Sequence, residues 1–131
     1  MNLAFPWPIT NGEWLAFTSA AITVLFGLIL LVAPALSFRI LRIAPLPGHP
    51  EAVSEGRATL AGFYLGVGLC CLLTGQFWVY LALGFSWAFT AFGRLVSILS
   101  DKASTPFNWL RLFLECALAG LALVFALGII S

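Results

Sequence analysis

The chain has 131 residues, of which 62% are hydrophobic and 8% are charged, with a formal net charge of +1. Because soluble domains carry about 25% charged residues, this composition excludes an ordinary water-soluble fold. The absence of a large basic patch argues against nucleic acid as a partner. Four spans of about 20 residues would use most of the chain. We therefore expect one transmembrane domain over residues 1–131.

Four apolar segments predict an all-α, integral membrane four-helix bundle, with spans at about residues 14–36, 56–74, 77–99 and 107–130. The first helix is expected to start near Thr10 or Asn11, which can cap it, and to be disrupted at Pro34. No basic stretch precedes this helix, so we interpret it as a retained span and not as a cleaved signal peptide.

Three connections separate these spans. Residues 37–55 are expected to form a long loop, Gly75-Gln76 a tight turn, and residues 101–105 a short loop. Thr105-Pro106 is typical of a helix start, with a capping threonine before a proline.

The basic residues predict the orientation of the chain. All six lie in or beside the two longer loops: Arg39, Arg42, Arg57, Arg94, Lys102 and Arg111. Lys and Arg in short loops are retained on the cytoplasmic side. We therefore expect both longer loops to be cytoplasmic and both termini to be periplasmic, in a cell inner membrane.

Small residues recur at helical spacing in the spans. Transmembrane helices associate through close contact at such residues. The second span carries five of them at four-residue steps: Ala58, Gly62, Gly66, Cys70 and Thr74. We interpret this stripe as packing within the bundle, with a homodimer face as the alternative. A shorter stripe, Ser19, Thr23 and Gly27, lies in the first span.

Two charged residues lie within spans, each on a small-residue face. Arg94 follows Ala82, Ser86 and Thr90 in the third span, and Glu115 precedes Ala119, Ala122 and Ala126 in the fourth. Intramembrane charges nearly always face the interior, so we expect both to point inward. Glu115 lies about 14 Å along its helix at 1.5 Å per residue. We expect Arg94 to be its first partner and Arg57 its second.

Five charged residues at this end are expected to form one network: Glu55, Arg57, Arg94, Arg111 and Glu115. Two interpretations stay open. The network either pins the helices together, or it forms a site for an anion, a lipid headgroup, a proton or an ion. No metal-ligand spacing and no nucleophile set is present, so we expect no metal and no cofactor.

Short motifs around these charges carry a family resemblance. They are Glu55-Gly-Arg57 with Gly62-Phe-Tyr-Leu-Gly66, then Phe92-Gly-Arg94-Leu-Val-Ser97 with Asp101, then Glu115. Over about residues 14–128 the chain resembles the bacterial four-helix membrane family called domain of unknown function 4345. It is more distantly similar to DoxX-type small membrane proteins. The resemblance implies a four-helix fold and no activity.

Two functions are predicted as alternatives. The first is a structural or accessory subunit, or a homo-oligomeric packing protein, whose partners are the bilayer and further copies or a larger membrane complex. The alternative is a small transporter, channel or anionic-lipid-binding protein that uses the charged network. A membrane enzyme is a third hypothesis, which the sequence supports with no catalytic group.

Overall fold

The computed structural model describes residues 5–130, and every regular element in that range is helical. The elements are α1 (Asn11–Val32), α2 (Pro34–Leu41), α3 (Glu51–Glu55), the π-helical turn η1 (Gly56–Leu60), α4 (Ala61–Thr74), α5 (Phe77–Ser100) and α6 (Pro106–Ala126). Helices α3, η1 and α4 follow one another without a break. Four helices are long and apolar enough to cross a membrane: Asn11–Val32, Glu51–Thr74, Phe77–Ser100 and Pro106–Ala126. The predicted all-α, four-span membrane fold is confirmed.

Threonine caps begin two of the spans. The Thr10 hydroxyl accepts the Glu13 N–H at 3.2 Å, and the Thr105 hydroxyl accepts the Asn108 N–H at 3.2 Å. Each bond satisfies a backbone donor that has no partner within the first helical turn. These two caps fix where α1 and α6 start.

The connection after α1 differs from the expected loop over residues 37–55. The chain bends at Ala33, and Pro34 then opens α2, because proline is well suited to a first helical position. Helix α2 ends at Leu41 with Arg42 in the left-handed conformation, and α3 resumes at Glu51. The first span consequently ends at Val32 and not near residue 36.

The last helix is also shorter than expected. It ends at Ala126 and not near residue 130, and Gly128 follows with a φ of 72°. A positive φ is easily adopted by glycine and interrupts the helical path.

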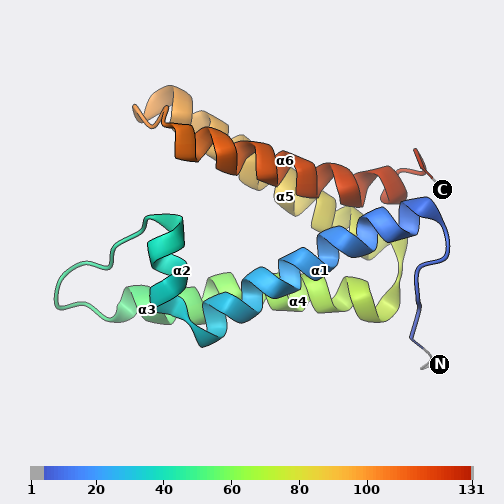
Figure 1. Cartoon of the computed structure of the whole chain (residues 1–131), viewed down its shortest axis with the longest axis horizontal. Coiled ribbons are helices and arrows are strands. Elements are labelled where there is room, and N and C mark those ends of the chain that lie inside the picture. Colours follow the sequence, from blue (N-terminus) through green and yellow to red (C-terminus); the bar gives the residue numbers. More distant parts are fainter. Residues whose placement is uncertain (1–4, 131) are drawn as a thin grey trace.

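The helices form two antiparallel pairs, α1 with α4 and α5 with α6 (Figure 1). Helix α1 also packs against α6, and α4 contacts α5 less extensively, with Tyr64 of α4 stacked on Trp87 of α5. The pairs lie close where α1 begins and α6 ends, which we call the terminal end. They diverge towards α2, α3 and the α5–α6 connection, which we call the basic end because all six Lys and Arg residues lie there.

Glycines allow the helices of each pair to approach closely. A Cβ atom added to Gly27 of α1 would lie 2.8 Å from Leu65 Cγ and 3.0 Å from the Leu65 backbone nitrogen in α4. A Cβ atom on Gly84 of α5 would lie 2.5 Å from Leu123 Cδ2 in α6. Such backbone proximity is the usual means by which helices associate in lipid.

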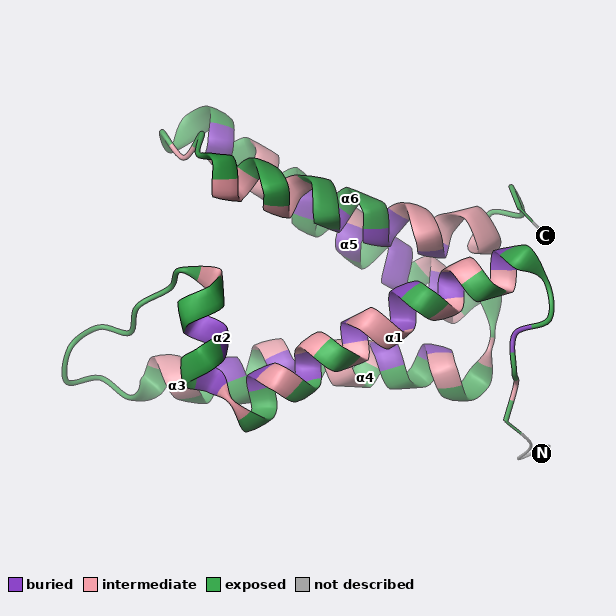
Figure 2. Ribbon diagram, in the orientation of Figure 1, coloured by how far each residue is buried: buried purple, intermediate pink, exposed green. Residues whose placement is uncertain are grey.

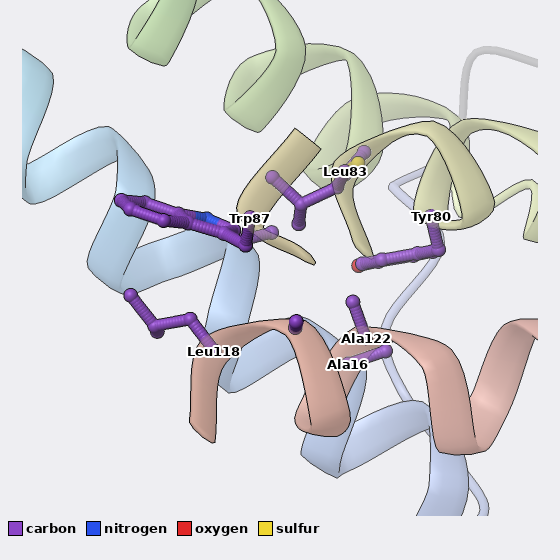
Figure 3. Close-up of a cluster of buried hydrophobic side chains, with 9 residues drawn as sticks. Ala16, Tyr80, Leu83, Trp87, Leu118 and Ala122 are labelled. Atoms are coloured by element: carbon purple, nitrogen blue, oxygen red, sulfur yellow. The ribbon is translucent and has the colours of Figure 1, made fainter. Parts of the chain in front are cut away.

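The apolar core lies where the two helix pairs meet (Figure 3). Its buried members are Ala16, Ala20, Cys71, Tyr80, Leu83, Trp87, Leu118, Ala119 and Ala122. Two interhelical hydrogen bonds run beside it. The Ser19 hydroxyl donates to the Leu118 carbonyl at 2.8 Å, and the Trp87 indole N–H donates to the Thr23 hydroxyl at 3.0 Å. These two bonds join the pairs near mid-span, and the helix ribbons diverge beyond it (Figure 2).

The small-residue stripe of the second span does not pack inside the bundle. All five residues are exposed: Ala58, Gly62, Gly66, Cys70 and Thr74. No atom lies within 4 Å of a Cβ added to Gly62 or Gly66. Helix α4 instead buries the neighbouring face with Ala61, Gly68 and Cys71. Ser19, Thr23 and Gly27 of α1 are buried.

Candidate functional site at the basic end

A buried carboxylate joins the third and fourth spans. Glu115 of α6 is 1% exposed, and Arg94 of α5 holds both of its oxygens. Arg94 Nε donates to Oε1 at 2.6 Å, and Nη2 donates to Oε2 at 2.9 Å. Two parallel bonds of this kind give both strength and a fixed orientation. This geometry ties the basic ends of α5 and α6 together.

The pair is also attached to the connection between α5 and α6. Arg94 Nη1 donates to Asn108 Oδ1 at 3.1 Å, and Asn108 Nδ2 donates to the Ala103 carbonyl at 2.9 Å. Arg94 thus has a structural partner on each terminal nitrogen. All three guanidinium nitrogens of Arg94 therefore donate hydrogen bonds within the described chain, two of them to Glu115.

Arg111 makes fewer hydrogen bonds than Arg94. It lies one turn before Glu115 on α6, and its Nη2 donates to Glu115 Oε2 at 3.3 Å. Within residues 5–130 this is its single side-chain hydrogen bond, although the side chain is only 19% exposed. A guanidinium carries five N–H donors. Most of the N–H donors of Arg111 therefore have no hydrogen-bond partner within residues 5–130.

The structure separates the other two predicted network residues from this cluster. Glu55 and Arg57 are exposed, and neither makes a salt bridge within residues 5–130. Both residues lie at the π-helical turn over Gly56–Leu60. It accommodates one more residue per turn than an α-helix, so positions at and before it are rotated relative to a regular helix. The charged cluster thus contains Arg94, Arg111 and Glu115.

A third arginine joins the site through the α2 segment. The guanidinium carbon of Arg42 lies 4.4 Å from the centroid of the Phe107 ring, and that of Arg111 lies 6.0 Å from the same ring. Such stacking is a cation–π interaction. Sequence reasoning assigned Arg42 only to membrane orientation. Its position depends on the bend at Ala33, for which Pro34 is the one sequence signal.

A cavity of about 790 Å³ lies between η1, α4 and the α5–α6 pair. We call it the polar chamber, since its lining includes Arg42, Arg94, Arg111, Asn108, Thr59 and Thr90. Its volume falls in the range of about 300–1,000 Å³ that is typical of ligand sites. Three arginines against one glutamate give the cluster a formal charge of +2.

A second cavity, of about 220 Å³, lies between α1, α2 and α6. We call it the apolar chamber, since it is lined mainly by side chains such as Phe26, Ile29, Leu30, Ile40, Trp87 and Leu114. Four residues line both chambers: Leu41, Leu60, Tyr64 and Arg111. The chambers therefore adjoin, with Arg111 at their junction.

The fold and the site define a multi-pass helical membrane protein with a basic cleft at one end of the bundle. Residues 13–126 match the family described as domain of unknown function (DUF4345), and the chain belongs to this family. No curated protein and no solved structure matches the chain. The more distant likeness to DoxX-type proteins stays a prediction.

Proposed function

We propose that this protein binds an anionic group in the polar chamber, as a lipid-binding protein or small carrier. The observation that carries this proposal is Arg111: four-fifths buried, at the junction of two cavities, with one long hydrogen bond to a carboxylate. Intramembrane charges without a full set of partners typically mark ligand or ion sites.

The charge balance supports an anion over a cation. Glu115 is engaged by the two shorter bonds from Arg94, so it offers little to an incoming cation. Arg42 and Arg111 flank Phe107 and leave the chamber positive. Arginine matches the planar, two-oxygen face of carboxylate and phosphate groups. The ligand chemistry is therefore an oxyanion, either free or as a lipid headgroup.

The test compares Arg111→Gln with Arg39→Gln. Arg39 lies at the same end of the bundle and is exposed, so its replacement removes the same charge outside the chamber. Charge-assisted hydrogen bonds contribute about 1.5–3 kcal/mol. We expect Arg111→Gln to weaken binding by about 10- to 100-fold and Arg39→Gln to leave it nearly unchanged.

Binding is measured on purified protein in two arms. One titrates inorganic phosphate calorimetrically in a non-ionic detergent. The other measures retention of phosphatidylglycerol by native mass spectrometry from nanodiscs of mixed phosphatidylcholine and phosphatidylglycerol. Binding in the first arm identifies a free oxyanion, and binding in the second alone identifies a headgroup. Equal effects of the two substitutions, or binding in neither arm, would overturn the proposal.

We also propose that the basic end faces the cytoplasm of a bacterial inner membrane, with both termini periplasmic. The support is the gathering of all six basic residues at that end and their absence from the other. Positive charge in short loops is retained in the cytoplasm. In this orientation the polar chamber receives ligands from the inner leaflet or the cytoplasm.

A second candidate is assembly with further copies through α4, or as an accessory subunit of a larger complex. It is supported by the exposed stripe from Ala58 to Thr74, in which Gly62 and Gly66 have open space around them. A second helix can approach closely at such a surface.

Cysteine cross-linking tests the homo-oligomeric form of this candidate. Cys70 is exposed within the stripe, whereas Cys71 is buried. In a Cys116→Ser background, assembly through the stripe predicts an oxidant-induced dimer that disappears with Cys70→Ser. A monomer under mild extraction and no cross-link in native membranes would count against a homo-oligomer.

A further inference from the structure

We propose that the two chambers form one site for a single-chain anionic amphiphile, an inference that rests on the proposed anion site. The anionic head lies in the polar chamber against Arg111, and the alkyl chain enters the apolar chamber. The inference rests on two adjoining cavities of opposite character, and on the position of one arginine between them.

The wall shared by the chambers suits such a molecule. Arg111 supplies hydrogen-bond donors to a head placed on the polar side. Leu41 and Leu60 supply apolar contact on both sides. The Tyr64 hydroxyl makes no hydrogen bond within residues 5–130, and it provides a second polar group at the boundary. The aromatic ring of Tyr64 stacks on Trp87, with centroids 5.5 Å apart.

The size of the apolar chamber favours one chain over two. At about 30 Å³ for each water, 220 Å³ corresponds to roughly seven waters, and a methylene group is about as large as a water. The apolar chamber therefore accommodates a single alkyl segment of about seven methylene groups. A two-chain phospholipid would have to leave its second chain outside in the bilayer.

This arrangement predicts how affinity depends on chain length. Burial of a methylene group from water strengthens binding by about fourfold. We expect this increment for each added methylene in a series of alkyl phosphates, until the apolar chamber is full at about seven carbons. A matched series of alkyl carboxylates distinguishes a phosphate head from a carboxylate head.

Substitutions that fill the apolar chamber separate its effect from partition into detergent. Ile29 of α1 lines this chamber and not the polar one, and Leu25 lies one turn away with 52% exposure. Ile29→Trp is expected to abolish the dependence on chain length while short-chain phosphate still binds. Leu25→Trp should behave as the wild type. Leu114→Trp fills the chamber from α6 and replaces Ile29→Trp if that variant does not fold.

Trp87 provides a direct readout, because it lines the apolar chamber. A bromine at the end of an alkyl phosphate chain should quench Trp87 fluorescence in the wild type. The quenching component should be lost in Trp87→Phe and reduced in Ile29→Trp.

The outcomes distinguish this inference from the proposed anion site. If short and long alkyl phosphates bind equally and both depend on Arg111, the anion site stands and the amphiphile inference fails. If a neutral alkyl glycoside binds as well as the alkyl phosphate, or Arg111→Gln changes nothing, both fail. An unchanged chain-length dependence in Ile29→Trp and Leu114→Trp, in folded protein, also overturns the inference.

Discussion

The two arginines that contact Glu115 differ in how many hydrogen bonds hold them. Arg94 occupies both carboxylate oxygens and is fastened to Asn108, so it determines the position of the acid. Arg111 contacts the same acid once, at 3.3 Å, and lines both chambers. Under the proposed function, Arg94 is the structural residue of the charged cluster and Arg111 is the ligand-binding one.

Removal of the buried charge should destabilise the protein. Glu115→Gln leaves Arg94 and Arg111 without a counter-charge, and breaking a buried pair costs about 3–5 kcal/mol. Unfolding in detergent, followed by circular dichroism, measures the loss. Arg94→Gln should cost a similar amount, and the double variant Arg94→Gln/Glu115→Gln should cost less than the sum.

Asp101→Asn is the control for this cycle. Asp101 is an exposed acid at the same end of the bundle, and its side chain bonds only with Ser97 in the described chain. Its replacement should change stability by less than about 0.5 kcal/mol. Strict additivity of the Arg94 and Glu115 variants would contradict a coupled pair.

The sequence predicted the pairing of Arg94 with Glu115, because the position of each residue could be judged within its own helix. Glu115 shares a buried face with Ala119 and Ala122 and bonds to Arg94, whereas the small residues on the stripe of Arg94, Ala82, Ser86 and Thr90, are exposed. Arg57 was expected to be the second partner of Glu115, but it lies exposed within the π-helical turn and makes no salt bridge in residues 5–130. Arg42 reaches the cleft through a change of chain direction at Ala33. Neither of these positions can be predicted from the hydrophobic periodicity of a single helix.

At the scale of the helices, α4 shows why spacing alone does not identify a packing face. Its regular stripe of small residues is exposed, whereas the less regular set of Ala61, Gly68 and Cys71 faces the bundle. Two glycines with similar sequence surroundings consequently have opposite environments. Gly27 abuts Leu65, whereas Gly62 meets nothing within 4 Å.

Substitution of these two glycines should have opposite effects. Gly27→Ala places a methyl group against the Leu65 side chain and backbone, and overpacking of this kind costs about 1–3 kcal/mol. Gly62→Ala adds no clash and gains helix propensity of up to about 1 kcal/mol. Thermal unfolding in detergent compares both with the wild type. A similar loss in the two variants would show that Gly62 is also packed, which only a contact outside this chain can supply.

At the scale of the whole molecule, the sequence predicted the number of spans and the turn at Gly75-Gln76. It did not predict that the two pairs diverge. The length of an apolar segment and the position of a Gly or Pro are local features of the sequence. The divergence of the two helix pairs depends instead on which faces of different helices meet. Here Ser19 and Thr23 join α1 to α6 and α5 near mid-span, and Trp87 of α5 contacts Phe26 and Tyr64 beside them.

The proposed orientation can be tested with fusions at the chain ends. With the basic end in the cytoplasm, a C-terminal alkaline phosphatase should be active and a C-terminal green fluorescent protein should be dark. Replacement of Arg39, Arg42 and Lys102 by Gln should weaken this preference, since the positive-inside rule depends on loop charge. A fluorescent C-terminal fusion in the unmodified chain would reverse the assignment.

The divergence of the helix pairs has a consequence for the surrounding lipid. A protein that widens towards one face takes up more area in that leaflet than in the other. Lateral pressure in the wider leaflet then acts to push the pairs together, whereas tension or curvature that relieves the pressure favours their separation. If the chambers bind a ligand as proposed, we expect lipids that alter packing in that leaflet to change its affinity without contacting the site.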